Sequence, residues 1–157
     1  MADKLIIEIF REKNAEEFTK ALAAPDSRLE TGSAAAMTAA IAMSLAARAA
    51  AACDQSGEKA QYIARNIETL RGYMVHLIDE DVKSRGPLRR AIKEGDARTI
   101  EAARQPAVCI DQEIINMMGQ ALELIAGLAE ICPKDSMLTV FVPVQKRLAI
   151  FPYRDVN

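Results

Sequence analysis

Two long runs of apolar residues recur in alternating steps of three and four, and they constrain the fold more than any other feature. The first run comprises Ile63, Ile67, Leu70, Met74 and Leu77. This spacing is typical of one face of an α-helix packed against other helices, and it predicts a helix over about residues 58–85. One further step of four residues lands on Asp81.

The second run predicts a longer helix that begins at Pro106. One stripe of this helix passes through Val108, Asp111, Ile115, Met118, Leu122, Ile125, Ala129 and Cys132. A neighbouring stripe contains Ile110, Ile114, Met117, Ala121, Leu124 and Leu128. Together they form a wide apolar face that we expect to be buried, with Asp111 on it.

Capping residues and prolines place a shorter helix before these two. Asn14 and Glu17 match the Asn-x-x-Glu capping box, and the helix that follows is expected to run to about Ala24, where Pro25 ends it.

An alanine-rich helix is expected to follow and to end near Cys53. Thr31 or Ser33 in the preceding turn can cap it. Its length also suits a membrane span, but alanine is weakly apolar and Arg48 lies within it, so a packed helix of a soluble protein is favoured.

Gly86 and Pro87 are expected to break the helix that starts near residue 58. Gly95 followed by Asp96 is typical of one helix ending where the next is capped, so residues 88–104 are predicted to form two short helices.

The end of the chain has a different character. Pro133 is expected to stop the last helix, and the segment MLTVFVPV is β-branched and aromatic. Residues 134–157 are therefore predicted to be extended, either pairing across a dimer or lying over the bundle. The chain as a whole, residues 1–157, is predicted to be a single all-α domain, a compact up-and-down bundle of about five to six helices with this extended C-terminal segment.

Composition narrows the class of function. The 157 residues are half apolar, enough to bury one core without a disulfide framework or a structural metal. The net charge is -2, and its 20 basic and 22 acidic residues are interspersed, which argues against nucleic acid and membrane surfaces as partners. We expect a small-molecule substrate and self-association instead.

Three widely spaced cysteines, Cys53, Cys109 and Cys132, form no CxxC pair and have no histidine nearby in the sequence. A disulfide framework and a zinc site are therefore not expected. The N-terminus lacks the pattern of a secretory signal, so a cytoplasmic location is expected.

Asp81 and Asp111 are the first candidates for acid–base chemistry. A carboxylate on an apolar face must be paired, hydrated or protonated, and burial raises its pKa toward the range useful for proton transfer. The alternative is that helix ends open both positions to water, and for Asp111 that a first-turn carboxylate complements the helix dipole. Asp79 and Glu80 either crowd Asp81 or form a solvated helix face.

The turn of Thr31, Gly32 and Ser33 is a candidate anion site. It presents free backbone N–H groups at a helix N-terminus, and Arg28 precedes it, so a carboxylate or phosphate could be held there. Ordinary capping explains the same residues. His76, the only histidine, lies off the apolar run and is expected to be exposed. No nucleotide-binding glycine motif occurs.

Three segments in this order carry a family resemblance: FTKALAAPDSRLETGSAAAMTAAIAMSLAA, LIDEDVKS and EAARQPAVCIDQEIINMMGQALELIAGLAE. They resemble the formiminotransferase-cyclodeaminase and methenyltetrahydrofolate cyclohydrolase family over about residues 15–131. The resemblance implies an all-helical, self-associating enzyme of folate one-carbon metabolism, a dimer or higher oligomer.

The implied reactions are ammonia release from formiminotetrahydrofolate or hydrolysis of methenyltetrahydrofolate. A tetrahydrofolate derivative would be the substrate, with no tightly bound cofactor and no metal. Asp79 and Asp81 match the acidic motif of the family.

Two segments depart from the family pattern. The family's Pro-Gly-Gly-Gly-Ser turn is Leu-Glu-Thr-Gly-Ser at residues 29–33, and a small and an aromatic residue after the acidic motif are replaced by Ser84 and Arg85. Two alternatives therefore stand beside the folate enzyme. One is a divergent relative acting on another small anionic substrate, and the other is a non-catalytic ligand-binding or assembly subunit.

Overall fold

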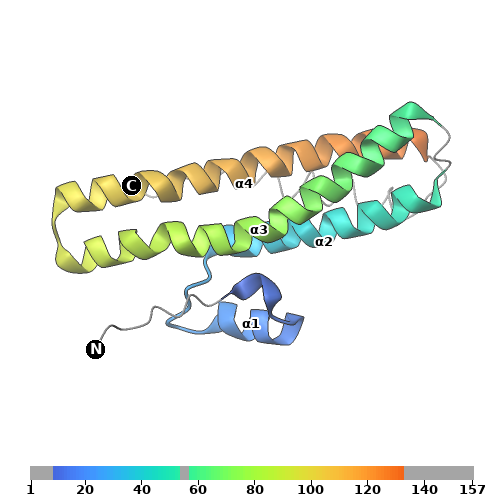
Figure 1. Ribbon diagram of the computed structural model, residues 1–157. Coiled ribbons are helices and arrows are strands. Elements are labelled where there is room, and N and C mark those ends of the chain that lie inside the picture. Colours follow the sequence, from blue (N-terminus) through green and yellow to red (C-terminus); the bar gives the residue numbers. More distant parts are fainter. Residues whose placement is uncertain (1–8, 54–56, 133–157) are drawn as a thin grey trace.

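The computed structural model describes residues 9–53 and 57–132, and the regular structure in these ranges is helical throughout. In chain order the elements are a 3₁₀ turn η1 (Phe10–Glu12) and the helices α1 (Ala15–Ala23), α2 (Thr31–Ala52), α3 (Glu58–Glu94) and α4 (Ala97–Ile131). Three long helices lie side by side, with α1 and η1 to one side (Figure 1). The predicted all-α class is confirmed, although the described residues form four α-helices and not five to six.

The difference arises at two prolines that do not end helices. Pro87 lies inside α3 and Pro106 inside α4. An interior proline costs a helix about 3 kcal/mol or more, because it removes a hydrogen bond and crowds the preceding turn. Ala91 and Ala107, which follow these prolines, are buried. Helix packing therefore continues past each proline and outweighs the local cost.

The predicted breaks at Gly86–Pro87 and at Pro106 are thus wrong, and residues 88–104 are not two short helices. They are the end of α3 and the start of α4, which form a long hairpin (Figure 1). The predicted boundary between them is confirmed. Gly95 adopts a left-handed conformation with φ 78°, and the Asp96 side chain accepts a hydrogen bond from the Thr99 N–H at 2.8 Å.

The helix α1 forms as its capping box predicts. The Asn14 side chain accepts from the Glu17 N–H at 2.9 Å, and the Glu17 carboxylate accepts from the Asn14 N–H at 3.3 Å. The helix ends before Pro25, as expected.

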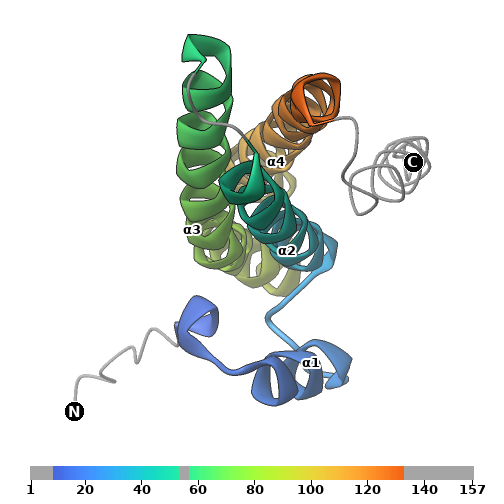
Figure 2. The ribbon, with the colours of Figure 1, turned by 90° about the vertical axis from the view of Figure 1, so that its right-hand side faces the viewer.

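The core lies where α2 packs against both α3 and α4 (Figure 2). All five apolar residues of the first run are buried, as predicted, and so is Asp81. Small residues of α2 allow close approach, and its buried face includes Ala36, Ala39, Ala40, Met43, Ala46, Ala49 and Ala50. The N-terminus of α2 lies against the middle of α3, where Ser33 of α2 contacts Ile78 and Asp81.

The wide apolar face of α4 is only partly buried. Ile114, Ala121 and Leu128 of the second stripe are buried as predicted. In the first stripe, however, Val108 and Ile115 are 47% and 46% exposed. The predicted extended segment over residues 134–157 lies outside the described residues.

By length and apolar composition, α2 and α4 are also long enough to cross a membrane. The core helix of a soluble protein passes the same test. For α2, the ten residues that it buries within the bundle explain its composition without a membrane.

Contrary to expectation, Cys53 and Cys132 form a disulfide, with their Cα atoms 6.0 Å apart. Cys53 directly follows α2 and Cys132 directly follows α4, so the bundle brings together two residues that are 79 positions apart in the sequence. Sequence spacing could not show this, because the two helix ends meet only in the folded bundle. Cys109 is a free, exposed cysteine.

We predict that Cys53→Ser lowers the free energy of unfolding of the oxidised protein by about 2–4 kcal/mol, because a cross-link over a long loop restricts the unfolded chain. Urea denaturation with and without reductant measures the effect. The reduced wild type should match the variant, and Cys109→Ser should match the wild type in both conditions. Equal stability of oxidised and reduced wild type would contradict the prediction.

Candidate active site

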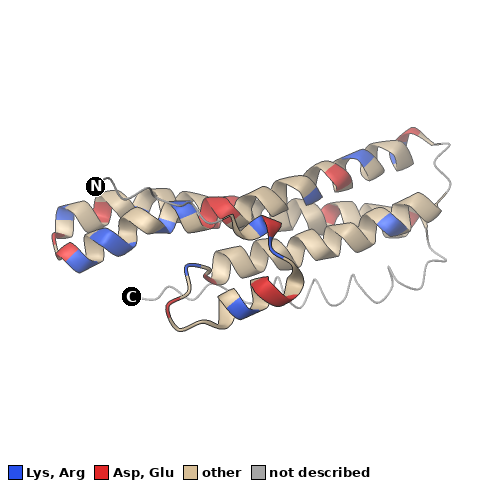
Figure 3. Cartoon of the chain, turned by 60° about the horizontal axis from the view of Figure 1, so that its bottom comes forward, with Lys and Arg blue, Asp and Glu red and all other residues tan. Residues whose placement is uncertain are grey.

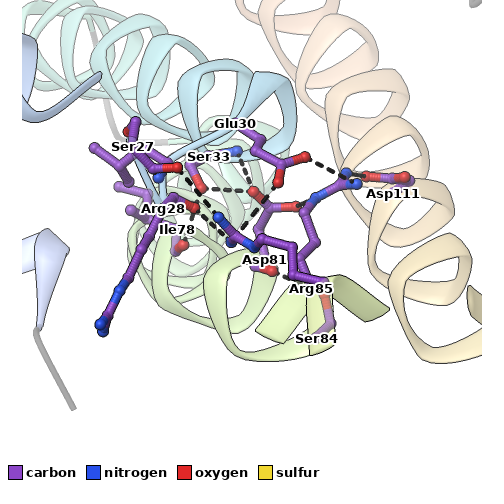
Figure 4. Close-up of polar contacts among 11 residues, drawn as sticks. Ser27, Arg28, Glu30, Ser33, Ile78, Asp81, Ser84, Arg85 and Asp111 are labelled. Atoms are coloured by element: carbon purple, nitrogen blue, oxygen red, sulfur yellow. Dashed lines mark hydrogen bonds and ion pairs between the residues drawn. The ribbon is translucent and has the colours of Figure 1, made fainter. Parts of the chain in front are cut away.

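A buried carboxylate, Asp81, lies where α3 meets the N-terminus of α2 (Figure 4). Its side chain is 0% exposed. One oxygen, Oδ2, accepts from the Ser33 N–H at 2.8 Å and from the Ser33 hydroxyl at 2.6 Å. The other, Oδ1, accepts from Arg85 Nε at 2.8 Å. Both oxygens of this carboxylate are therefore engaged.

Gly32 makes this contact possible. A Cβ atom at Gly32 would lie 2.7 Å from Cγ of Asp81 and closer still to its Oδ1. Because no side chain fits there, the single glycine of the turn lets the carboxylate approach the helix N-terminus, where the helix dipole stabilises a negative charge. The candidate anion site at this turn thus holds the chain's own Asp81.

The expected cap of α2 is wrong. The helix begins at Thr31, its N-cap is Glu30, and the Glu30 side chain makes no capping hydrogen bond. Ser33 lies within the first turn and uses its hydroxyl to bind Asp81. Thr31 is exposed.

Arg85 joins three carboxylates from three segments of the chain. Besides Asp81, it contacts Asp111 of α4 at 2.5 Å and Glu30 at 3.3 Å (Figure 4). Burial lowers the pKa of the guanidinium, but the hydrogen bond and charge of Asp81, with Asp111 and Glu30, raise it above its ordinary value. Arg85 was not among the predicted site residues. The usable signal was its position four residues after a buried aspartate, which places both on one face of the helix.

Asp111 is brought to the same cluster, as its place on the apolar face of α4 suggested. Its side chain is 19% exposed, unlike that of Asp81. Burial raises the pKa of the Asp111 carboxyl, and the nearby charge of Arg85 opposes that rise only in part. Among the described residues, Arg85 is the only hydrogen-bonding partner found for Asp111, through Oδ1.

Asp79 lies apart from this cluster. Asp79 precedes Asp81 by two positions in the helix, which turns their side chains about 200° apart. Asp79 is buried against η1, where it accepts from the Phe10 N–H at 2.8 Å and pairs with Arg11 at 3.4 Å. The structure therefore gives Asp79 a part in holding the N-terminal segment, and its catalytic role stays a prediction. His76 is exposed, as predicted.

A second arginine holds the loop before α2. Arg89 donates to the backbone oxygens of Ser27 at 3.1 Å and Arg28 at 2.9 Å, and lies 3.7 Å from Glu30. The Arg28 side chain is exposed and points away from the cluster (Figure 4). A role for Arg28 in binding an anion stays a prediction.

The charged residues elsewhere are mixed along the sequence of the helices, with Lys and Arg interspersed among Asp and Glu (Figure 3). Within residues 9–53 and 57–132, no group of three or more His, Cys, Asp or Glu residues is arranged to hold a metal ion. A carboxylate such as Asp111 can transfer a proton, and the guanidinium groups nearby can orient anions.

Comparison with family models matches residues 14–140 to the formiminotransferase-cyclodeaminase domain. The matched range includes the turn at Gly32 and the acidic motif around Asp81. It also includes Asp111. No curated protein and no solved structure matches the chain.

We predict that Gly32→Ala lowers the free energy of unfolding by about 1–3 kcal/mol, because the added methyl group displaces the pinned Asp81 carboxylate. Gly72→Ala is the matched control, since a Cβ atom at this helical glycine would meet nothing within 4 Å. It should be neutral or stabilising by up to about 1 kcal/mol. Urea denaturation of both variants measures this, and a Gly32→Ala protein as stable as the control would show that the close contact is unimportant.

Proposed function

Because the chain belongs to the formiminotransferase-cyclodeaminase family, we propose that it is an enzyme of folate one-carbon metabolism acting on a tetrahydrofolate derivative. The reaction is release of ammonia from formiminotetrahydrofolate or hydrolysis of methenyltetrahydrofolate. The observation that carries the proposal is the contact between Ser33 and Asp81. It joins the turn at residues 29–33 to the acidic motif, two parts of the family resemblance that are 48 residues apart in the sequence.

The charge of the cluster supports this substrate class. When all five groups are ionised, the carboxylates of Glu30, Asp81 and Asp111 and the guanidinium groups of Arg85 and Arg89 have a formal sum of -1. The reacting carbon of both candidate substrates belongs to an amidine-type group that carries positive charge. A partly buried site of net negative charge favours such a cation, because the low local dielectric strengthens the attraction.

Asp111 is the carboxylate that we assign to proton transfer. It is partly exposed, and its raised pKa brings it nearer to the working pH of a general acid or base. In hydrolysis, the oxygen of water adds to the methenyl carbon and Asp111 accepts a proton from that water. The added oxygen then becomes the formyl carbonyl as a carbon–nitrogen bond of the ring breaks, Asp111 returns the proton to the released nitrogen, and the hydroxyl proton passes to solvent. In deamination, a second nitrogen of the tetrahydrofolate adds to the formimino carbon and closes the ring of methenyltetrahydrofolate. Asp111 takes the proton from that nitrogen and delivers it to the departing ammonia as the bond between this carbon and the amino nitrogen breaks.

Asp81, the first candidate from the sequence, is assigned to positioning instead. Its oxygens are occupied by Ser33 and Arg85, and it is closed to solvent. In this arrangement Asp81 fixes the N-terminus of α2 and the guanidinium of Arg85. For the anionic end of the substrate we retain Arg28 and Thr31, which are both exposed, whereas Gly32 and Ser33 are committed to Asp81.

We also propose that the protein forms a homo-oligomer, a dimer or higher. The exposed Val108 and Ile115 on α4, and Ile41 on α2, are apolar surface of the kind that self-association covers. We propose that it works without a tightly bound cofactor and without nucleic acid or membrane partners. A cytoplasmic location stays a prediction from the sequence, and the Cys53–Cys132 disulfide argues against it, because such bonds are rare in a reducing compartment.

A second function has its own supporting observation. Asp81 is completely buried with both oxygens engaged, and Glu30 occupies a position where the family has glycine. These features favour a non-catalytic ligand-binding or assembly subunit that retained the fold, or a divergent enzyme for another small anionic substrate.

To test the enzyme proposal, the pure protein is incubated with methenyltetrahydrofolate and the loss of its absorbance is followed. We predict that Asp111→Asn lowers the rate by about 10²- to 10⁴-fold, the usual contribution of a positioned acid or base. Glu123→Gln, an exposed substitution on the same helix, should retain the wild-type rate.

Wild-type and Asp111→Asn rates that both equal the buffer background would exclude this reaction. Thermal stabilisation by folates without turnover would then favour the ligand-binding subunit. A parallel assay of ammonia release from formiminotetrahydrofolate separates the two candidate reactions.

A further inference from the structure

We propose that Arg85 is a positioning residue that holds Asp111 beside Asp81 and favours the ionised form of Asp111. The catalytic consequence of this inference rests on the proposed function, whereas its effect on Asp111 does not.

The first argument is geometric. Each of the three guanidinium nitrogens of Arg85 faces a different carboxylate: Nε faces Asp81 at 2.8 Å, one terminal nitrogen faces Asp111 at 2.5 Å, and the other faces Glu30 at 3.3 Å. The Arg85 side chain is only 13% exposed. One side chain therefore ties α4 and the segment before α2 to a single point on α3.

The second argument concerns the balance of charge around Asp111. The groups that act on its ionisation are Arg85 and Asp81 of α3 and Glu30 of the segment before α2. Asp81 and Glu30 are anions and disfavour a further negative charge, as does burial. Among these groups Arg85 alone favours the ionised form, so the charge state of Asp111 depends on it.

The third argument is that Asp81 does not depend on Arg85 to the same extent. Asp81 retains the Ser33 N–H and hydroxyl as donors at the N-terminus of α2. Asp111 has Arg85 as its only hydrogen-bonding partner among the described residues. Replacing Arg85 therefore acts mainly on Asp111.

The chemistry of the side chain supports the same assignment. A guanidinium is planar and presents several N–H donors in fixed directions, so it can contact three separate carboxylates at once. An ammonium group is a compact point charge on a flexible chain, and lysine would supply the charge without fixing the three directions.

The test is a pH titration of the Asp111 carboxyl by carbon-13 NMR in the full-length protein, with the signal assigned by its absence in Asp111→Asn. We expect Arg85→Gln to move the titration midpoint to higher pH, because the one favourable charge is lost. Arg85→Lys should move it less, and it keeps the test informative if the glutamine variant does not fold. Arg89→Gln is the matched control and should leave the midpoint in place, because the partners of Arg89 within the described part of the chain are Glu30 and two backbone oxygens of the loop before α2.

An unmoved midpoint in both Arg85 variants, or an equal movement in Arg89→Gln, would overturn the inference. If the wild type also turns over a folate substrate, the acidic limb of its pH–rate profile should move in the same direction in Arg85→Lys. Absence of turnover in the wild type would count against the proposed function alone, since the titration needs no substrate.

Discussion

The buried carboxylate of Asp81 is the constraint on which the rest of this site depends. A charge removed from water is tolerated only when hydrogen bonds and opposite charge replace its hydration. Here Ser33 supplies two donors, and Arg85 supplies the opposite charge. The requirement explains why a glycine stands at position 32 and why the alanine-rich helix α2 begins against the middle of α3.

Because Ser33 and Arg85 occupy both oxygens of Asp81, we assign proton transfer to Asp111 and not to Asp81. A carboxylate whose oxygens are both engaged inside the core has no room for a substrate. The same arginine that neutralises Asp81 extends to Asp111, which retains contact with solvent. Asp81 therefore organises the junction of three segments, and in the proposed function Asp111 is the aspartate that acts on the substrate. The turn at residues 29–33, which differs from the family pattern, binds Asp81 and leaves Asp111 as the carboxylate that we assign to proton transfer.

Local patterns predicted those parts of the structure that local physics determines. The capping box at Asn14, the left-handed Gly95 and the buried run that ends at Asp81 all form as expected. The breaks predicted at Pro87 and Pro106 were wrong, because packing along the whole α3–α4 hairpin outweighs the free-energy cost of a proline inside a helix. Arg85 was missed because a charged residue on a helix is ordinarily solvated, and only the fold shows that three carboxylates converge on it.

The most direct test of these two roles compares the stabilities of two substitutions, Asp81→Asn and Asp111→Asn, by urea denaturation at neutral pH. Asp81→Asn should lower the free energy of unfolding by about 3 kcal/mol or more, because Arg85 and the Ser33 donors lose the buried charge that they bind. Loss of the partly exposed Asp111 charge should cost about 1 kcal/mol or less. Equal losses, or a larger loss for Asp111→Asn, would contradict the assignment of Asp81 as the structural centre of the site.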